Sequence, residues 1–450
     1  MSRWAARSRF IGAVLVAALL LDGAAVARVR PHYGGEVRIE TAEPEAPDFV
    51  KLLVTETLTS VDAKGAVHPG LAVRWQSSNG DRRWQFQLRA GVRLHGLDSD
   101  VPLTTTLVAD ALRSGLAKTG IEGRVHPNGD GVYVEFDAPV PQLPALVGDA
   151  QFAIAGYDAS GVVMGSGPYA IQSIAAPRMT LAQNPDYVGA RRYPETITVL
   201  WSRSAKEQAL DLAAKRADLI EVPAEDLHRA QQERARLTRL EAAEIVVLTE
   251  EKAGTGDIKL RQALSETIDR SALLNFIFQK QGEISASLLP NWMTGYSALL
   301  PVAHDTAHAR QLRGEAGGKA SFTLGYNAGD TEMQLLAERL ALNARETGIT
   351  IQAVPRTRDV DWRLRRMAVP SAHPAAALTE IAHELHRSVE LSDTTLESVY
   401  RAERAVLADY TVIPLLHLNR GWAASERLHD WSGASAFAPL PEETWVESKP

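Results

Sequence analysis

A strand–helix–strand pattern occupies residues 321–354, which read SFTLGYNAGDTEMQLLAERLALNARETGITIQAV. Ser321–Tyr326 and Ile349–Val354 are short, partly β-branched runs that predict strands. Thr331–Thr347, between them, has the apolar spacing of an amphipathic helix. We expect one side of this helix to carry Leu335, Leu336, Ala337 and Leu340. Such a βαβ unit predicts an α/β protein whose parallel sheet is covered by helices.

A second unit, rich in short strands, lies earlier in the chain. Leu71–Trp75 and Trp84–Arg89 alternate apolar and polar residues, as half-buried strands do. They are joined through Asn79-Gly80, a dipeptide that supplies the positive φ angles of a tight hairpin. Leu103–Leu116 has helical spacing, and Val132–Phe136 returns as a strand. These elements predict a small α+β domain.

The first residues have the pattern of a secretory signal peptide. The apolar run Phe10–Leu21 follows three arginines, and Ala25-Val26-Ala27 places small residues where a signal peptidase cleaves. An uncleaved membrane anchor is the alternative, but the run of about twelve residues is shorter than the roughly twenty that a bilayer span needs. We therefore expect cleavage after Ala27 and an exported, periplasmic, soluble protein.

Composition excludes several classes of function. The chain has 450 residues, of which 45% are hydrophobic and 23% charged, a composition and length that suit two or three globular domains. Its 48 Lys and Arg against 55 Asp and Glu give a net charge of −7, so nucleic acid is not expected as a partner. The chain has no cysteine, which excludes disulfides, thiolate-ligated metals, a thiol nucleophile and a lipid anchor on an amino-terminal cysteine.

Three short motifs resemble catalytic or metal-binding signatures but have the wrong spacing. His383–His386 has two residues between its histidines where a zinc-protease helix has three, so the ligands would not share a face. Asp98–Asp100 lacks the Gly and Glu that a calcium loop requires. Gly165–Gly167 lacks the flanking residues of a nucleophile elbow, and no P-loop or dinucleotide fingerprint occurs. We predict no enzyme, catalytic residue, metal or cofactor; a hydrolase with scattered active-site residues is the alternative.

The order of motifs along the chain resembles one known family, the family 5 extracellular solute-binding proteins of ABC importers for oligopeptides, dipeptides and nickel. The most specific similarity lies in Val67–Trp75 and Trp84–His95, with a pro-gly-leu-ala stretch, a tryptophan, a hairpin and an arg-x-gly-val turn. Further similarities, in the family's order, lie in Gly34–Val37, Gly165–Tyr169, Asn184–Tyr187, Lys259–Ser265, Tyr400–Arg404 and Ile413–Leu416.

The resemblance implies a two-lobed fold of the periplasmic-binding-protein type II class, with an extra small α+β domain (cluster C). It divides the chain into a signal peptide (residues 1–27), a discontinuous lobe I (34–50, 150–250 and 418–450), an inserted domain (51–149) and lobe II (251–417). The chain would cross between lobes at hinges near Glu250 and Leu416. The resemblance further implies a monomer that captures a peptide or related small solute between its lobes and delivers it to an ABC importer permease. A derived non-transport binding protein, such as a sensor or envelope chaperone, is the alternative.

The segment of lobe II that would bind the ligand departs from the family. Peptide-binding members have a trp-x-x-asp-tyr-x-asp-pro type of segment whose acidic residue receives the peptide's amino group. The corresponding stretch here, Trp362–Pro374, is shorter and has no carboxylate. Its three arginines, Arg363, Arg365 and Arg366, either receive an anionic group or are solvated charges at a strand edge. The chain is also shorter than typical members, mainly in the insert and the second lobe.

Candidate ligand-binding residues follow from their order along the chain in this resemblance. They are Glu43, Trp292, Tyr296, Trp362, His373 and Trp422. For the aromatic members a place in the hydrophobic core is the alternative, because large aromatic side chains are buried at least as often as they bind ligands.

Overall fold

The computed structural model describes residues 30–47, 49–61, 66–97, 99–119, 121–252, 257–317, 320–431 and 440–447. The predicted signal peptide, residues 1–27, lies outside the described residues, as does Asp98 of the calcium-loop motif. In the described part of the chain, no helix has both the length and the apolar character needed to cross a membrane.

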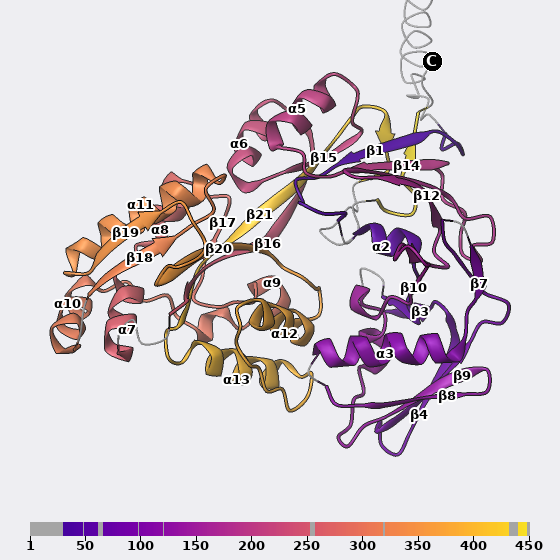
Figure 1. Ribbon diagram of the computed structural model, residues 1–450, viewed down its shortest axis with the longest axis horizontal. Coiled ribbons are helices and arrows are strands. Elements are labelled where there is room, and N and C mark those ends of the chain that lie inside the picture. Colours follow the sequence, from indigo (N-terminus) through magenta and orange to yellow (C-terminus); the bar gives the residue numbers. More distant parts are fainter. Residues whose placement is uncertain are drawn as a thin grey trace, which may run out of the picture.

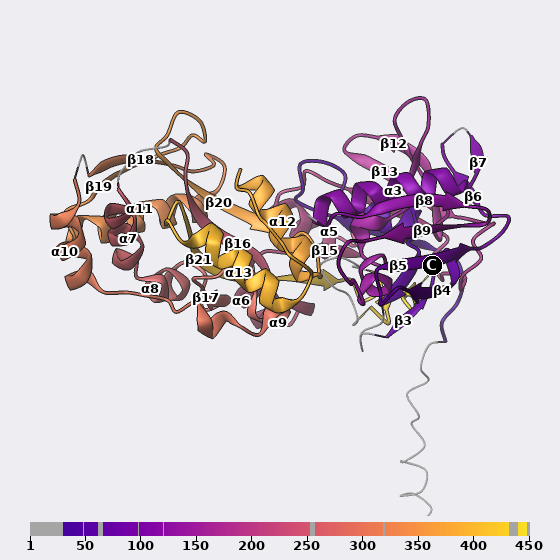
Figure 2. The same cartoon turned by 90° about the horizontal axis from the view of Figure 1, so that it is seen from below.

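A mixed sheet, eleven strands within the described residues, runs through the molecule (Figure 1). Its strand order is β12-β13-β14-β1-β15-β21-β16-β20-β18-β19, with β17 beside β21. Two long strands, β16 (Arg236–Glu250) and β21 (Val412–Ala424), pair antiparallel in the middle. The molecule extends from them as two lobes, which Figure 2 shows side by side, and each lobe has its own hydrophobic core.

The first lobe contains the β15 side of the sheet. Its strand β1 alternates charged residues with Val37 and Ile39, both fully buried, and runs parallel to β14 and β15. Its elements are β1 (Glu36–Glu40), α2 (Phe49–Val54), β10 (Gly156–Tyr157), β11 (Val163–Met164), β12 (Tyr169–Ala175), β13 (Arg178–Gln183), β14 (Thr196–Leu200), α5 (Ala205–Ala213), β15 (Leu219–Val222), α6 (Ala224–Gln232), β22 (Leu428–His429) and β23 (Trp445–Val446).

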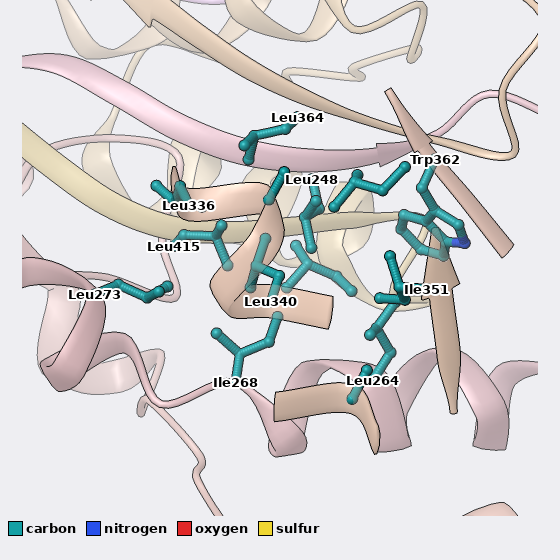
Figure 3. Close-up of a cluster of buried hydrophobic side chains, with 14 of the residues drawn as sticks. Leu248, Leu264, Ile268, Leu273, Leu336, Leu340, Ile351, Trp362, Leu364 and Leu415 are labelled. Carbon is teal, nitrogen blue, oxygen red and sulfur yellow. The ribbon is translucent and has the colours of Figure 1, made fainter. Parts of the chain in front are cut away.

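The second lobe contains the predicted βαβ unit. Strands β18 and β19 are parallel, with Ser321 opposite Thr350, which confirms the prediction. Leu336 and Leu340 of the connecting helix are buried in the core (Figure 3), but Leu335 is 49% exposed because it points about 100° away from Leu336. The expectation was therefore wrong at Leu335. The elements are α7 (Ile258–Thr267), α8 (Arg270–Phe276), β17 (Gly282–Ile284), α9 (Asn291–Thr294), η2 (Ser297–Leu299), α10 (Thr306–Glu315), β18 (Ser321–Gly325), α11 (Thr331–Glu346), β19 (Thr350–Val354), β20 (Trp362–Ala368), α12 (Pro374–Glu384) and α13 (Leu396–Leu407).

A small α+β domain is inserted early in the chain. Its antiparallel sheet has the order β4-β5-β9-β8, and helix α3 packs on it through a separate core. Asn79 and Gly80 have φ angles of 55° and 62° in the turn between β4 and β5, which confirms the predicted hairpin. The elements are β2 (Thr59–Val61), β3 (Val67–Pro69), β4 (Ala72–Ser78), β5 (Arg83–Leu88), β6 (Arg93–His95), β7 (Asp100–Pro102), α3 (Thr105–Thr119), β8 (Arg124–Asn128), β9 (Gly131–Glu135), α4 (Leu143–Leu146) and η1 (Ala150–Phe152).

Strand β16 passes from one lobe to the other at a bulge. Its residues Arg236–Leu240 pair with Arg420–Ala424 of β21, whereas Glu244–Glu250 also pair with β20 of the second lobe. Between these segments the register shifts, Ala242 adopts a φ of 45°, and its N–H donates to Asn419 Oδ1 at 3.0 Å. The bulge lies nearer the first lobe than the crossing expected at Glu250. The predicted domain boundaries themselves stay predictions.

Candidate ligand-binding cleft between the lobes

A cleft of about 710 Å³ lies where the two lobes and the inserted domain meet. The first lobe contributes the segment from the end of β1 to α2 and parts of β15 and β21, the inserted domain the ends of α3 and η1, and the second lobe the end of β20 and α12. The charged residues on its wall are Glu43, Glu45, Lys51, Lys118, Glu221, Arg366, Glu380, Glu384 and Arg420. The apolar residues include Phe49, Leu52, Met367, Val369 and Trp422. A mixed lining of this kind suits a small solute with both polar and apolar parts.

Arg420 of β21 lies close to three carboxylates on the first-lobe side of the cleft. Its Nη2 donates to Glu221 Oε1 of β15 at 2.6 Å. Its Nε lies 3.7 Å from Glu244 Oε1, and its Nη1 lies 3.9 Å from Glu43 Oε1. Glu221 is the single charged residue of the apolar strand β15, and Arg420 the single arginine of β21, whose other polar residues are His417 and Asn419; the pairing of β15 with β21 brings the two together.

Arg366 of β20 makes a second, tighter cluster. It donates from Nε and Nη2 to Glu244 Oε2, at 2.9 and 2.7 Å. It also forms a bidentate pair with Glu225 of α6, with Nη1 and Nη2 at 3.3 and 3.1 Å from the two carboxylate oxygens. Glu225 belongs to the first lobe and Arg366 to the second, so this pair joins the lobes next to the cleft.

Burial and charge act against each other in these clusters. Burial raises the pKa of Glu221 and of Glu225, because each carboxyl group loses the water that would stabilise its charge, and Arg420 and Arg366 oppose this effect. For both arginines burial alone would lower the pKa, but the neighbouring carboxylates outweigh it and raise the pKa instead. Both guanidinium groups therefore stay charged.

Neither interpretation of the arginines at 363–366 describes the surroundings of Arg365 and Arg366. Strand β20 pairs with β16 along its length but with β18 only at its first two residues. The side chains of Arg365 and Arg366 are only 9% and 14% exposed, so the expectation of solvated charges was wrong for these two. Arg365 donates to Glu251 Oε1 at 2.9 Å, and Arg366 is held by two carboxylates. A guanidinium that already pairs with carboxylates has little capacity left for an anionic ligand.

Two of the predicted ligand-binding residues lie on the cleft wall. Glu43 follows β1 and keeps 43% of its side chain exposed, while Trp422 is 3% exposed and packs edge-on against Phe49 with ring centroids 6.2 Å apart. Their roles as ligand contacts stay predictions.

Two other candidates lie in hydrophobic cores. Trp362 is 2% exposed and belongs to the core of the second lobe (Figure 3). Tyr296 is 8% exposed, and its hydroxyl donates to Glu403 Oε2 at 2.6 Å. Neither residue is part of the cleft wall. Both lie in the hydrophobic core, which was the alternative to ligand binding for the aromatic candidates.

Trp292 and His373 lie beside the cleft and not on its wall. Trp292 is half exposed, and its Nε1 donates to the carbonyl oxygen of Ala242 at the β16 bulge, at 3.3 Å. His373 precedes α12, and its buried Nδ1 has no partner among the described residues. Burial lowers the pKa of His373, and the nearby Asp149 of the inserted domain opposes this effect. His373 therefore lies where the second lobe meets the inserted domain.

Sequence reasoning missed most of the polar cleft residues. These are Glu45, Lys51, Lys118, Gln151, Glu221, Glu380, Glu384 and Arg420. For Glu221 and Arg420 there was a usable signal, because a charge inside a mostly apolar strand needs a buried partner. The others lie on a loop or on helices at the surface, where polar residues are common.

Two lobes, joined by a pair of crossing strands around a mixed cleft, define a bilobal binding protein. A family model described as "Bacterial extracellular solute-binding proteins, family 5 Middle" matches residues 66–370, and the chain belongs to this family. The resemblance noted in the sequence is thereby confirmed, together with the mixed α/β, two-lobed fold.

Known relatives are distant in sequence and close in fold. The dipeptide-binding protein of Escherichia coli (strain K12) is 21% identical over 303 residues, which are 57% of this chain and only 56% of that relative. The Helicobacter pylori periplasmic binding protein DppA in complex with peptide STSA has a TM-score of 0.77 at 14% identity, covering 93% of this chain and 99% of that one. The Escherichia coli murein tripeptide binding protein MppA has a TM-score of 0.74 at 16% identity, covering 91% and 98%.

Proposed function

We propose that this chain is an exported solute-binding protein that captures a peptide or related small solute in the cleft and delivers it to the permease of an ABC importer. The observation that carries the proposal is one cavity whose walls come from both lobes and the inserted domain. Its volume of about 710 Å³ falls within the roughly 300–1,000 Å³ of small-molecule sites. The three relatives described above are, by their names, binders of a dipeptide, a peptide STSA and a murein tripeptide.

The geometry supports capture by closure. A solute that contacts both lobes stabilises the arrangement in which both contacts exist, and so shifts the population toward the closed form. In the described arrangement, α12 of the second lobe packs against α3 of the inserted domain (Figures 1 and 2). Ser371 donates to Asp149 at 2.8 Å across this contact. The bulge at Ala242 in β16 is our candidate for the hinge.

Removal of residues 1–27 on export to the periplasm rests on the sequence pattern of those residues. A monomeric state, absence of catalysis and the domain boundaries given above rest on the resemblance to the family. A sensor or envelope chaperone on the same scaffold is the alternative, and no feature of the described residues favours it.

The test is native mass spectrometry of residues 28–450 purified without denaturation, followed by thermal unfolding with a pool of short peptides. We expect a co-purified mass, or a melting temperature that rises with peptide concentration, because a ligand at 100 times its Kd stabilises by about 2.7 kcal/mol. Ala368→Trp places a large ring at an exposed position of the cleft wall and should abolish the shift, whereas Ala214→Trp, on the exposed end of α5, should not.

A protein that no peptide stabilises, or an Ala368→Trp variant that binds as the unchanged protein does, contradicts the proposal. Uptake of a labelled peptide by cells that contain the protein and its permease separates transport from a sensor or chaperone role.

A further inference from the structure

Hydrogen bonds tie the inserted domain to the first lobe. His95 of β6 and Gly165, which follows β11 of the first lobe, exchange two backbone hydrogen bonds, at 2.8 and 3.1 Å. The His95 ring also lies against the first lobe, with its Nε2 3.4 Å from Asp186 Oδ2. We therefore expect the insert and the first lobe to move together. A contact between the insert and the second lobe then forms only when the two lobes close.

The second lobe meets the insert in such a contact. Helix α12 packs against α3, and Ser371, just before α12, donates from its Oγ to Asp149 Oδ2 at 2.8 Å. Ser371 is 3% exposed, so water has little access to this bond. The other oxygen of Asp149 caps η1 of the insert, where it accepts from the backbone N–H of Gln151 at 3.2 Å. Both carboxylate oxygens of Asp149 therefore already have a donor.

A histidine lies in the same contact without a hydrogen-bond acceptor for its ring. The backbone N–H of His373 donates to Ser371 Oγ at 2.9 Å, but the imidazole forms no hydrogen bond with any of the described residues, and its Nδ1 is buried. A protonated imidazole carries a hydrogen on both nitrogens. Protonation would therefore place a charged N–H donor at a buried position that has no acceptor, which is unfavourable while the contact exists.

The charges around His373 do not reverse this preference. Asp149, facing it from the insert, favours the protonated ring, but burial is the larger effect, and the pKa of His373 is lowered from its ordinary value. The other charged or titratable groups on the two helices of the contact are Asp110, Arg113 and Lys118 of α3, and Glu380, His383 and Glu384 of α12. Of the described residues, Asp149 is the charged group that acts on the pKa of His373.

We propose that the contact of Ser371 and His373 with the insert is a latch that acid opens, so that protonation of His373 separates the lobes and releases the solute. In the open form the ring meets water and is protonated at its ordinary pKa of about 6.5. Protons therefore bind the open form better than the closed one. The closed form keeps its full stability above pH 6.5 and loses stability as the pH falls below that value. This inference rests on the proposed function, to which it adds how the solute is released.

The test measures closure directly in residues 28–450. The chain has no cysteine, so a pair of dyes can be attached at two introduced ones, Asn128→Cys in the insert and Glu397→Cys on α13, both at exposed positions. Single-molecule energy transfer between the dyes gives the ratio of closed to open protein without any ligand. If the ring is protonated only in the open form, this ratio should fall by up to about tenfold between pH 7.5 and pH 5.5.

Variants then assign the effect. His373→Gln keeps a polar side chain that cannot be protonated, and should reduce the change with pH to less than about twofold. His383→Gln, at an exposed position of the same helix, is the matched control and should keep the full change. Ser371→Ala removes the bond to Asp149 and should lower the closed-to-open ratio about threefold or more at both pH values, while the fall with acid remains.

The outcomes separate the latch from the proposed function. A closed-to-open ratio that does not fall at pH 5.5, or that falls equally in His373→Gln, overturns the latch. Titration of the same labelled proteins with a pool of short peptides tests peptide capture: the peptides should close the protein at pH 7.5, and at pH 5.5 more peptide should be needed unless His373 is replaced. If no peptide closes the protein, peptide capture is overturned, and the response of the ligand-free protein to acid still decides whether the latch exists.

Discussion

Tyr296→Phe tests whether the Tyr296 hydroxyl stabilises the folded core or binds the ligand. The hydroxyl donates to Glu403 Oε2 at 2.6 Å, and Glu403 is fully buried. The other carboxylate oxygen accepts from the backbone N–H groups of Leu288 and Leu289 and from the Ser287 hydroxyl, at 2.5, 3.0 and 2.9 Å. The substitution therefore removes the one donor that the structure shows on Oε2 and keeps the aromatic ring.

The magnitude follows from the chemistry of that bond. A hydrogen bond to a charged group contributes about 1.5–3 kcal/mol, and a buried carboxylate oxygen left without a donor loses that amount. We expect Tyr296→Phe to lower the free energy of unfolding by about 2–3 kcal/mol, which for a lobe of this size corresponds to roughly 4–12 °C in melting temperature. Burial raises the pKa of Glu403, and the Tyr296 hydroxyl lowers it. Since the bond favours the ionised carboxylate, the loss should be larger at pH 8 than at pH 5.

The assay is thermal unfolding followed by circular dichroism, with peptide titration of the same samples. Tyr157→Phe is the control, because that side chain is 66% exposed and should change stability by less than about 0.5 kcal/mol. Peptide affinity should be unchanged in both variants. If Tyr296→Phe melts as the unchanged protein does but binds peptide more weakly, the hydroxyl serves the ligand, and the structural argument is refuted.

Two further substitutions test local features of the fold. Burial and the neighbouring Asp211 raise the pKa of Glu40 from 4.5 to about 7, so the folded state holds this proton more tightly than the unfolded chain does. The stabilisation from Glu40 is complete below pH 4.5 and is lost as the pH rises through 7. In urea unfolding, Glu40→Gln should therefore remove up to about 3 kcal/mol of the change in unfolding free energy with pH. A pH dependence that the substitution leaves unchanged contradicts the assignment. A Cβ at Gly165 would lie 2.1 Å from the Val54 carbonyl oxygen, so Gly165→Ala should cost about 2 kcal/mol or more. Gly314→Ala on α10, with no atom within 4 Å of the added Cβ, should instead stabilise by up to about 1 kcal/mol, and equal effects of the two would refute the close-approach argument.

Only part of the candidate site could be predicted from the sequence. Glu43 and Trp422 were placed on the cleft by their order in the chain, and they lie there. The same reasoning failed to separate them from Trp362 and Tyr296, which lie in cores, because an aromatic side chain has the same apolar character in a core and in a binding site. The Tyr296 hydroxyl bonds to Glu403, which lies 107 residues further along the chain, and no local sequence pattern predicts that bond.

The sequence by itself determined the elements whose causes are local. The βαβ unit and the Asn79-Gly80 hairpin depend on periodicity and turn chemistry within about thirty residues. The tertiary structure alone decided the electrostatics of the cleft, because Arg420 meets Glu221 across 199 residues of chain, and Arg366 meets Glu225 across 141. Such pairs form only when the sheet has assembled and both partners have lost water, so their charge balance depends on the folded arrangement and not on any local stretch of sequence.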